Sequence, residues 1–318
     1  MSHRTSGMVI AILSALLFST SGILAKPLLE AGWTSGAAVL VRIGGAALVM
    51  LIPTVVLISR SPAAVRSNWR YLVAYGLFPI AGAQLGFYTA IRTLPVGIAL
   101  LIEYLAPVYV VGWLWLRRGQ RPGPLTVAGA VTSVVGLVLV LDPFSGQGVD
   151  PVGVAWAFGS SLCVVVYFLL SAQVADDLSP GLVIGVGMIV GCLALAAAGL
   201  VGLLPMAMST GSATLDSVTM PWWGYVVALA VVSTVLPYVT GIMAVSRLGP
   251  RLGAFIALAE VVFAAILAWL LLGQSATFSQ LVGGVLIIVG VILVKLGEPA
   301  PDPLKAATRA TADLPRTG

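Results

Sequence analysis

The sequence predicts an all-α integral membrane protein, with ten transmembrane helices arranged as two inverted five-helix repeats around a central cavity. Hydrophobic residues make up 59% of the 318 residues and charged residues only 8%, whereas soluble domains carry roughly 25% charged residues. The apolar residues are gathered in ten runs, and the second half of the chain repeats a pattern of the first. A chain of this composition needs lipid around it to cover its apolar surface.

The ten apolar runs mark the expected spans. A spanning helix needs about 20 mostly apolar residues, and the segments between the runs hold Pro, Gly and most of the charges. The polar tail of residues 298–318 is expected to be disordered and cytoplasmic. The predicted helices are Gly7–Ala25, Ser35–Ile58, Tyr71–Thr89, Val96–Leu116, Pro124–Leu141, Val152–Ala172, Gly181–Leu203, Pro221–Val245, Leu252–Leu272 and Phe278–Leu296.

The basic residues predict the orientation, because the cytoplasmic loops of membrane proteins are enriched in Lys and Arg. With the N-terminus in the cytoplasm, the inner segments hold 13 basic residues and the outer segments hold only Lys26 and Arg92, with Arg42 set aside inside a helix. Both termini are then cytoplasmic. We expect a multi-pass protein of the cell inner (plasma) membrane. The basic residues lie in short clusters between apolar runs, so the net charge of +5 does not indicate binding of nucleic acid.

An internal repeat relates the two halves of the chain. A shift of 154 residues aligns residues 90–140 with residues 244–294 without a gap. It predicts an N-terminal five-helix repeat, residues 1–145, and a C-terminal one, residues 146–297. An odd number of helices forces the repeats to insert in opposite orientations, an architecture that recurs in secondary transporters with the substrate site between the halves. The aligned identities are Ala90/Ala244, Leu94/Leu248, Trp115/Trp269, Leu116/Leu270, Gly119/Gly273, Gln120/Gln274, Gly129/Gly283, Val131/Val285, Val135/Val289, Gly136/Gly290, Leu139/Leu293 and Val140/Val294.

Two stretches carry recognisable motifs. One runs from Leu236-Pro237-Tyr238 through Arg247-Leu248-Gly249-Pro250 and Ala257-Leu258-Ala259-Glu260 to Leu271-Leu272-Gly273-Gln274. The other runs from Pro95-Val96-Gly97-Ile98-Ala99 through Ile102-Glu103-Tyr104-Leu105 to Pro107. Together with the repeat, they resemble the ten-helix EamA-type exporters of the drug/metabolite transporter superfamily. The second stretch is similar to the threonine/homoserine type of amino-acid exporters.

The resemblance implies a helical basket around a central cavity, and efflux of amino acids or related metabolites. Two positions depart from the family pattern. Many members have Glu where this chain has Gln274, and many have Pro after Glu260, where this chain has Val261. These departures bear on the substrate subgroup and not on the family.

Three ionisable residues, Arg42, Glu103 and Glu260, lie inside predicted spans. A charge in the bilayer core costs at least a few kcal/mol, so such residues usually mark substrate pathways or ion pairs. Arg42 and Glu103 both lie about 10 Å below the outer surface at 1.5 Å per residue. We therefore expect them to pair in the empty protein and to be separated by a zwitterionic substrate. Three alternatives stay open: Arg42 extends to the outer interface, the glutamates make a structural ion pair or hydrogen bond, or Arg42 and Glu103 form a permanent clamp between the second and fourth helices.

Glu260 lies roughly 12 Å from the cytoplasmic end of its helix. For this residue we expect either proton coupling or binding of a substrate amine. Pro79, Pro107 and Pro237 should weaken their helices and free backbone carbonyls, which must then face protein or a water-filled cavity.

Polar and aromatic residues of other spans complete the candidate site. Gln84 and Tyr88 are four residues apart and share a helix face, and tyrosines of three further helices can line a cavity. For any single hydroxyl, packing between helices is the alternative. The predicted substrate-binding residues are Thr20, Ser21, Arg42, Gln84, Tyr88, Glu103, Tyr104, Tyr167, Tyr238 and Glu260.

These observations favour a secondary exporter of a small metabolite, an amino acid or a similar compound, working by alternating access. A passive channel or a lipid translocator is the alternative, because an inverted repeat excludes neither. An enzyme is disfavoured, since the only histidine, His3, lies outside the spans and cannot serve as a base there. No cofactor or metal is expected. The expected partners are a small-molecule substrate and membrane lipid, while proton coupling and the oligomeric state stay open.

Overall fold

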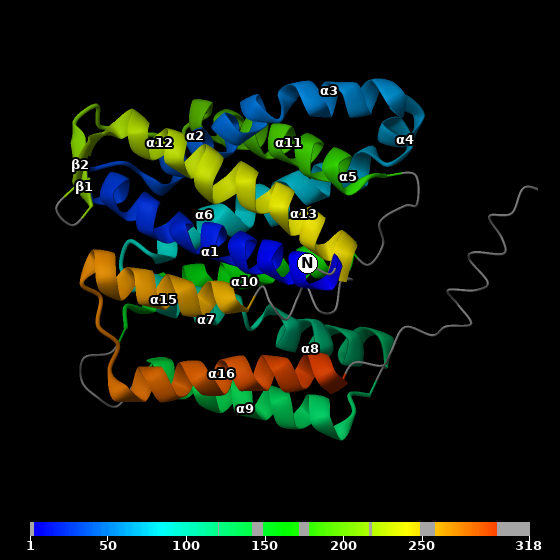
Figure 1. The fold of residues 1–318 in the computed structure, drawn as a ribbon, viewed down its shortest axis with the longest axis vertical. Helices are drawn as coiled ribbons and strands as arrows, with labels where there is room; N and C mark the ends of the chain where they lie inside the picture. The colour runs from blue at the N-terminus through cyan, green and yellow to red at the C-terminus, as the bar shows by residue number, and fades with distance from the viewer. Residues whose placement is uncertain are drawn as a thin grey trace, which may run out of the picture.

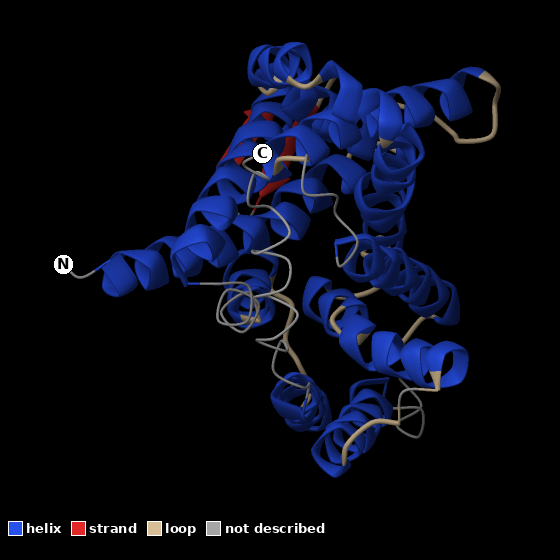
Figure 2. Ribbon diagram, turned by 90° about the vertical axis from the view of Figure 1, so that its right-hand side faces the viewer, coloured by secondary structure: helices blue, strands red, loops and turns tan. Residues whose placement is uncertain are grey.

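The computed structural model describes residues 3–119, 121–141, 149–171, 178–215, 218–248 and 258–297. The helices lie side by side along a common direction (Figure 1), and Figure 2 views the same bundle from its end. The elements are α1 His3–Glu30, α2 Ser35–Val49, α3 Leu51–Arg60, α4 Pro62–Ser67, α5 Trp69–Tyr75, η1 Gly76–Gly82, α6 Ala83–Ala90, α7 Val96–Glu103, α8 Ala106–Arg118, α9 Pro124–Leu141, α10 Pro151–Ser171, α11 Pro180–Leu200, β1 Ser212–Leu215, β2 Val218–Pro221, α12 Trp222–Ala230, η2 Val231–Val235, α13 Leu236–Leu248, α15 Ala259–Leu272 and α16 Phe278–Gly297.

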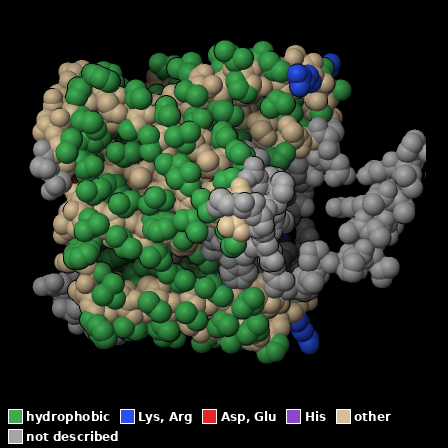
Figure 3. Space-filling view, viewed as in Figure 1, with side chains coloured by type: hydrophobic (Ala, Val, Ile, Leu, Met, Phe, Trp, Pro, Cys, Tyr) green, Lys and Arg blue, Asp and Glu red, His purple; other side chains and the backbone are tan. Residues whose placement is uncertain are grey.

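Length and apolar character identify helices that can cross a membrane. The described residues include six such helices, Thr5–Glu30, Val96–Arg117, Pro151–Leu170, Pro180–Leu200, Trp222–Gly241 and Phe278–Gly297. The bent pair α2 and α3 makes a seventh if it is one span, and α9 and α15 are apolar but shorter. Large apolar side chains cover the outside (Figure 3), among them Ile52, 77% exposed, and Leu116, 85% exposed. Such a surface is suited to lipid, and the chain is therefore a multi-pass membrane protein.

Within the described part of the chain, each predicted helix range is helical, although several of these ranges are interrupted. The start of the predicted helix Leu252–Leu272 and the tail after residue 297 lie outside the described residues. The antiparallel hairpin β1–β2 between α11 and α12 was not predicted. It lies in a polar stretch between two apolar runs. Its two strands are short and contain no long apolar run that would mark them in the sequence.

Prolines explain four interruptions of the helices. Proline has no N–H and its ring clashes with the carbonyl four residues earlier, so it breaks or bends a helix there. Accordingly, α2 ends at Val49, four residues before Pro53, and the axis bends by 59° into α3. The α-helical geometry of α5 ends four residues before Pro79, where the π-helical segment η1 begins.

The same rule applies to the two helices that carry candidate residues. Helix α7 ends at Glu103, four residues before Pro107, and the freed Glu103 carbonyl accepts a hydrogen bond from Ser161 Oγ of α10 at 3.0 Å. In η2, Ser233 lies four residues before Pro237, and its carbonyl is likewise satisfied by a side chain. The sequence-based expectation that Pro79, Pro107 and Pro237 weaken their helices is confirmed.

The two π-helical segments occupy related positions. A shift of 154 residues places η1 on residues 230–236, a range that contains all of η2. Single π-helical turns inside α-helices are frequent at functional sites. Each of these segments lies in the middle of a helical run, between α5 and α6 and between α12 and α13.

Helices α9 and α16 form a close pair at one edge of the bundle (Figure 1). A Cβ atom on Gly129 would lie 2.5 Å from the Gly290 carbonyl oxygen, and one on Gly136 would lie 2.6 Å from the Gly283 carbonyl oxygen. Only glycine permits this approach. As residue numbers rise along α9 they fall along α16, so the two helices are antiparallel.

A contact between helix ends explains one departure from the family pattern. Gln274, just after the end of α15, accepts a hydrogen bond from the backbone N–H of Val96 at 3.0 Å through Oε1. Val96 is the first residue of α7, whose N–H groups lack partners within the helix. A glutamate here would offer the same acceptor oxygen, so Gln274 preserves the contact.

Candidate functional site

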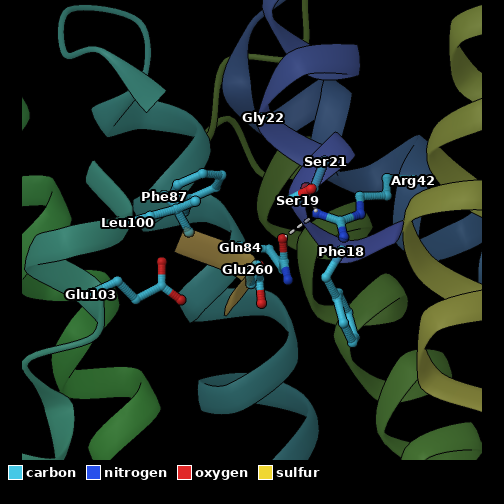
Figure 4. A pocket seen from close by; sticks show the side chains of 10 residues that line it. All are labelled: Phe18, Ser19, Ser21, Gly22, Arg42, Gln84, Phe87, Leu100, Glu103 and Glu260. Carbon is cyan, nitrogen blue, oxygen red and sulfur yellow. Dashed lines mark hydrogen bonds between the residues drawn. The ribbon is translucent and has the colours of Figure 1, made fainter. Parts of the chain in front are cut away.

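A central cavity of about 40 Å³ lies among α1, α2, α6, α7 and α15. At 10–15 Å³ per water, this space holds about three water molecules. Four of these helices belong to the first predicted repeat and one to the second, so both halves of the chain contribute. The side chains that line the cavity, drawn in Figure 4, are Phe18, Ser19, Ser21, Gly22, Arg42, Gln84, Phe87, Leu100, Glu103 and Glu260.

Arg42 is 1% exposed, and one side of its guanidinium binds η2. Nε donates to Thr234 Oγ1 at 2.8 Å, and Nη2 donates to the Ser233 carbonyl at 2.9 Å. That carbonyl has lost its helical donor because Pro237 has no N–H. Arg42 therefore satisfies a backbone group that would otherwise be unpaired inside the membrane.

The other side of the guanidinium binds α1 and α6. Nη1 donates to Gln84 Oε1, to Ser21 Oγ at 2.7 Å and to the Tyr88 hydroxyl at 3.1 Å. The Tyr88 ring also lies under the guanidinium, with its centroid 5.4 Å from Cζ. Arg42 thus ties α2 to three other segments through neutral acceptors, which satisfy most of the donors of this buried charge.

The two carboxylates have fewer partners. Glu260 Oε2 accepts a hydrogen bond from the Tyr104 hydroxyl at 2.7 Å. Glu103 lies beside the Ser160 hydroxyl, but Ser160 donates its single proton to the Ala83 carbonyl at 2.7 Å. Both glutamates are half-buried and face the cavity (Figure 4). Most of their lone pairs are therefore available to a ligand.

The expected ion pair between Arg42 and Glu103 in the empty protein is wrong. Within the described residues, all hydrogen bonds of the guanidinium go to neutral groups. Figure 4 shows Gln84 between the two side chains, with its oxygen on Arg42. Equal depth along two helices does not fix the lateral distance between their side chains, and here both side chains line the same cavity without a direct hydrogen bond. The alternative that Arg42 extends to the outer interface is also wrong, because its side chain is buried.

The other predicted residues fall into four groups. Ser21, Gln84, Glu103 and Glu260 line the cavity with Arg42, whereas Tyr88 and Tyr104 bind these residues from behind. Tyr238 lines a smaller neighbouring cavity together with Arg42, Gln84 and Thr234. Thr20 and Tyr167 line neither cavity. The Thr20 hydroxyl donates to the Leu17 carbonyl of its own helix at 2.6 Å, and the Tyr167 ring packs on Tyr75 with centroids 6.0 Å apart.

Sequence reasoning missed the aromatic and apolar lining of the cavity, and the role of Thr234 toward Arg42. Phe87 is three residues after Gln84 and so shares its helix face, a signal that could have identified it. Phe18 carries no such signal. Thr234 is 192 residues from Arg42 in the sequence, and only the folded chain brings the two together.

Comparison with known proteins places these features in a family. The sequence pattern of the EamA-like transporter family matches residues 5–142 and again residues 151–296. The uncharacterized inner membrane transporter YicL of Salmonella typhimurium is 26% identical over 305 residues, 93% of this chain and 97% of YicL. The threonine/homoserine exporter RhtA of the same species is 28% identical over 228 residues, 71% of this chain and 70% of RhtA.

A solved crystal structure shares the fold, with a TM-score of 0.55 at 24% identity over 92% of this chain and 97% of its own. The family pattern extends over nearly all of the helical part of the chain, including every helix that lines the cavity. The protein therefore belongs to the EamA-like transporter family.

Proposed function

We propose that this chain is a secondary transporter that exports a small metabolite, an amino acid or a similar compound, by alternating access. The central cavity carries the proposal, because it gathers three ionisable side chains inside an otherwise apolar bundle (Figure 4). Charged groups are costly in a membrane and usually face a substrate pathway. Since Arg42 and Glu103 come from one half and Glu260 from the other, movement between the halves would change their surroundings.

Ten spans in two inverted repeats, residues 1–145 and 146–297, complete the proposed architecture. The antiparallel contact of α9 with α16 supports it, since these helices are equivalent in the repeat and their aligned glycines meet reciprocally. The matching positions of η1 and η2 and the two matches of the family pattern give further support. Inverted repeats of this kind allow the substrate site to open to each side in turn.

The substrate class follows from the relatives and the cavity. Relatives named threonine/homoserine exporters support an amino-acid substrate. The cavity holds one cation and two carboxylates, a poor match for nucleotide sugars or sugar phosphates, because polyanions usually need several cations. We assign substrate contact to Ser21, Gln84, Glu103 and Glu260, with the tyrosines behind them in positioning roles.

Glu260 is also the proposed site of proton coupling. A carboxyl group that binds either a proton or a substrate amine couples the movement of protons in one direction across the membrane to the movement of substrate in the other. An inwardly directed proton gradient would then drive export.

The proposed location is the inner membrane, with cytoplasmic termini. A relative described as an inner membrane transporter supports it, as does the bias of Lys and Arg toward one end of the bundle (Figure 3).

Counterflow in proteoliposomes separates this proposal from a passive channel or a lipid translocator. Vesicles loaded with unlabelled L-threonine should accumulate labelled L-threonine from outside above its equilibrium level. A channel gives no such overshoot.

Reporter fusions test the ten-helix topology. Fusions after Gln120 and after Leu296 should be cytoplasmic, and one after Gln147 should be periplasmic. A periplasmic reporter at Leu296 would refute this topology.

A further inference from the structure

We propose that the cavity recognises its substrate by an ammonium group held between Glu103 and Glu260, and that Arg42 does not bind a substrate carboxylate. The inference rests on the proposed transport function and narrows its substrate class. Primary amines without a free carboxylate, such as amino-acid amides, should be accepted as well as the amino acids themselves. Compounds that keep the carboxylate but lack the amine should be rejected.

The hydrogen-bond donors of Arg42 are nearly all in use. A guanidinium has five N–H groups. Nε–H goes to Thr234, one N–H of Nη2 goes to the Ser233 carbonyl, and both N–H groups of Nη1 serve three acceptors. One N–H remains, whereas the strong pairing of a carboxylate with arginine uses two parallel N–H groups. A substrate carboxylate would have to displace one of these acceptors, and at Ser233 it would leave a buried carbonyl unpaired.

The acceptors of the two glutamates are largely unused. An ionised carboxylate accepts about four hydrogen bonds, yet Glu260 receives one from Tyr104 and the Ser160 proton beside Glu103 goes elsewhere. Figure 4 shows the Glu103 side chain extending from α7 toward the middle of the cavity, where Glu260 of α15 also lies. An ammonium group has three N–H donors and no acceptor. It therefore complements two carboxylates that approach from different helices.

The rest of the lining suits the same ligand. Phe18 and Phe87 present rings to the cavity, and the Tyr238 ring packs edge-on against Phe18 with centroids 5.1 Å apart. Aromatic rings attract cations through their faces. Gln84 turns its oxygen to Arg42, so its amide nitrogen is a neutral donor within the cavity lining. A neutral donor can donate to a carboxylate oxygen or to an amide oxygen alike.

Matched compounds test the proposal on the wild-type protein. The purified full-length protein is melted with L-threonine, L-threoninamide or N-acetyl-L-threonine, and each compound also competes with labelled L-threonine in counterflow. A second series uses L-phenylalanine, its amide and its N-acetyl derivative. We expect the amides to raise the melting temperature and compete at least as well as the amino acids, and the N-acetyl compounds to do neither.

Failure of the proposed function and failure of this inference give different results. If neither amino acid is transported or bound, the proposed transport of amino acids is wrong and the inference falls with it. If the amino acids and N-acetyl compounds compete while the amides do not, transport stands and recognition through the ammonium group is wrong.

Single carboxamide variants locate the ammonium site. Glu103→Gln and Glu260→Gln should each weaken L-threoninamide binding at least about tenfold, the value of a lost charge-assisted hydrogen bond. Glu30→Gln is the matched control, because Glu30 is exposed at the end of α1, outside the cavity, and should leave binding unchanged. A melt without ligand checks that each variant is folded. Unchanged amide binding in both folded cavity variants would overturn the assignment.

Discussion

Two charged regions inside the bundle are built in opposite ways. The guanidinium of Arg42 is buried, and its hydrogen bonds reach Ser21, Gln84 and Thr234 on three other segments. The carboxylates of Glu103 and Glu260 are half-buried and have at most one donor each within the described residues. A satisfied buried charge rigidifies a fold, whereas acceptors that face a cavity are free to bind a ligand. The cation is therefore structural, and the anions are available for function.

The largest expected effect comes from Arg42→Gln. The substitution leaves the Ser233 carbonyl and several side-chain acceptors without a donor, which costs about 3 kcal/mol and lowers the melting temperature by about 5 °C. Binding of L-threoninamide to the folded fraction should persist. Arg92→Gln is the control, because Arg92 is exposed and the same change there should leave melting unaltered. If Arg42→Gln melts like the wild type but no longer binds L-threoninamide, then Arg42 acts on the ligand and the contrast between the two regions is wrong.

A smaller effect is expected from Thr234→Val, which keeps the shape of the side chain and removes the acceptor of Arg42 Nε. One unpaired buried donor costs about 2 kcal/mol, or about 3 °C in melting temperature. Thr240→Val is the matched control one helix segment away, where the hydroxyl donates to the carbonyls of Leu236 at 2.8 Å and Pro237 at 3.2 Å and does not contact Arg42. Equal melting of the two valine variants would contradict the structural role of the Arg42 contacts.

Tyr104→Phe tests the carboxylate side of the comparison. Loss of the 2.7 Å hydrogen bond leaves Glu260 less well oriented, so L-threoninamide binding should weaken about fivefold while melting changes by less than about 3 °C. Tyr109→Phe serves as control, since the Tyr109 hydroxyl is buried and has no hydrogen-bond partner among the described residues. Its removal should leave binding unchanged and melting equal or slightly higher. A larger loss of stability than of binding in Tyr104→Phe would show that this hydroxyl is structural.

The smallest effect concerns Asp150, a carboxylate outside the spans that has its own donors. The Thr93 hydroxyl and the backbone N–H of Gly153 hydrogen-bond to it and lower its pKa from the ordinary value of 3.8. A lowered folded-state pKa gives stability that is complete above pH 3.8 and is lost as the pH falls through the folded value. Asp150→Asn should therefore melt about 1 °C lower than wild type, equally at pH 6 and pH 8, because Asn can still cap the helix but lacks the negative charge at its N-terminus. The two curves should converge below pH 3.8, and a difference that grows on acidification would contradict this account.

The sequence determined the fold class and most of the helices. Composition and run length suffice for this, because lipid requires each span to satisfy its own backbone hydrogen bonds. Proline positions also specified interruptions at Tyr75, Glu103 and Ser233, since the missing N–H always frees the carbonyl four residues earlier. The bend before Pro53 follows the same rule and was overlooked within an otherwise continuous apolar run.

Sequence also singled out Arg42, Glu103 and Glu260, because a charge inside an apolar run stands out by its cost alone. Which partner each charge would have was decided only by the tertiary structure. Depth along a helix is local and follows from counting residues, whereas lateral distance depends on how the helices pack. Packing brought both Gln84 and Thr234 to the guanidinium as hydrogen-bond acceptors. It thereby turned an expected ion pair into a satisfied structural cation beside two carboxylates that face a cavity.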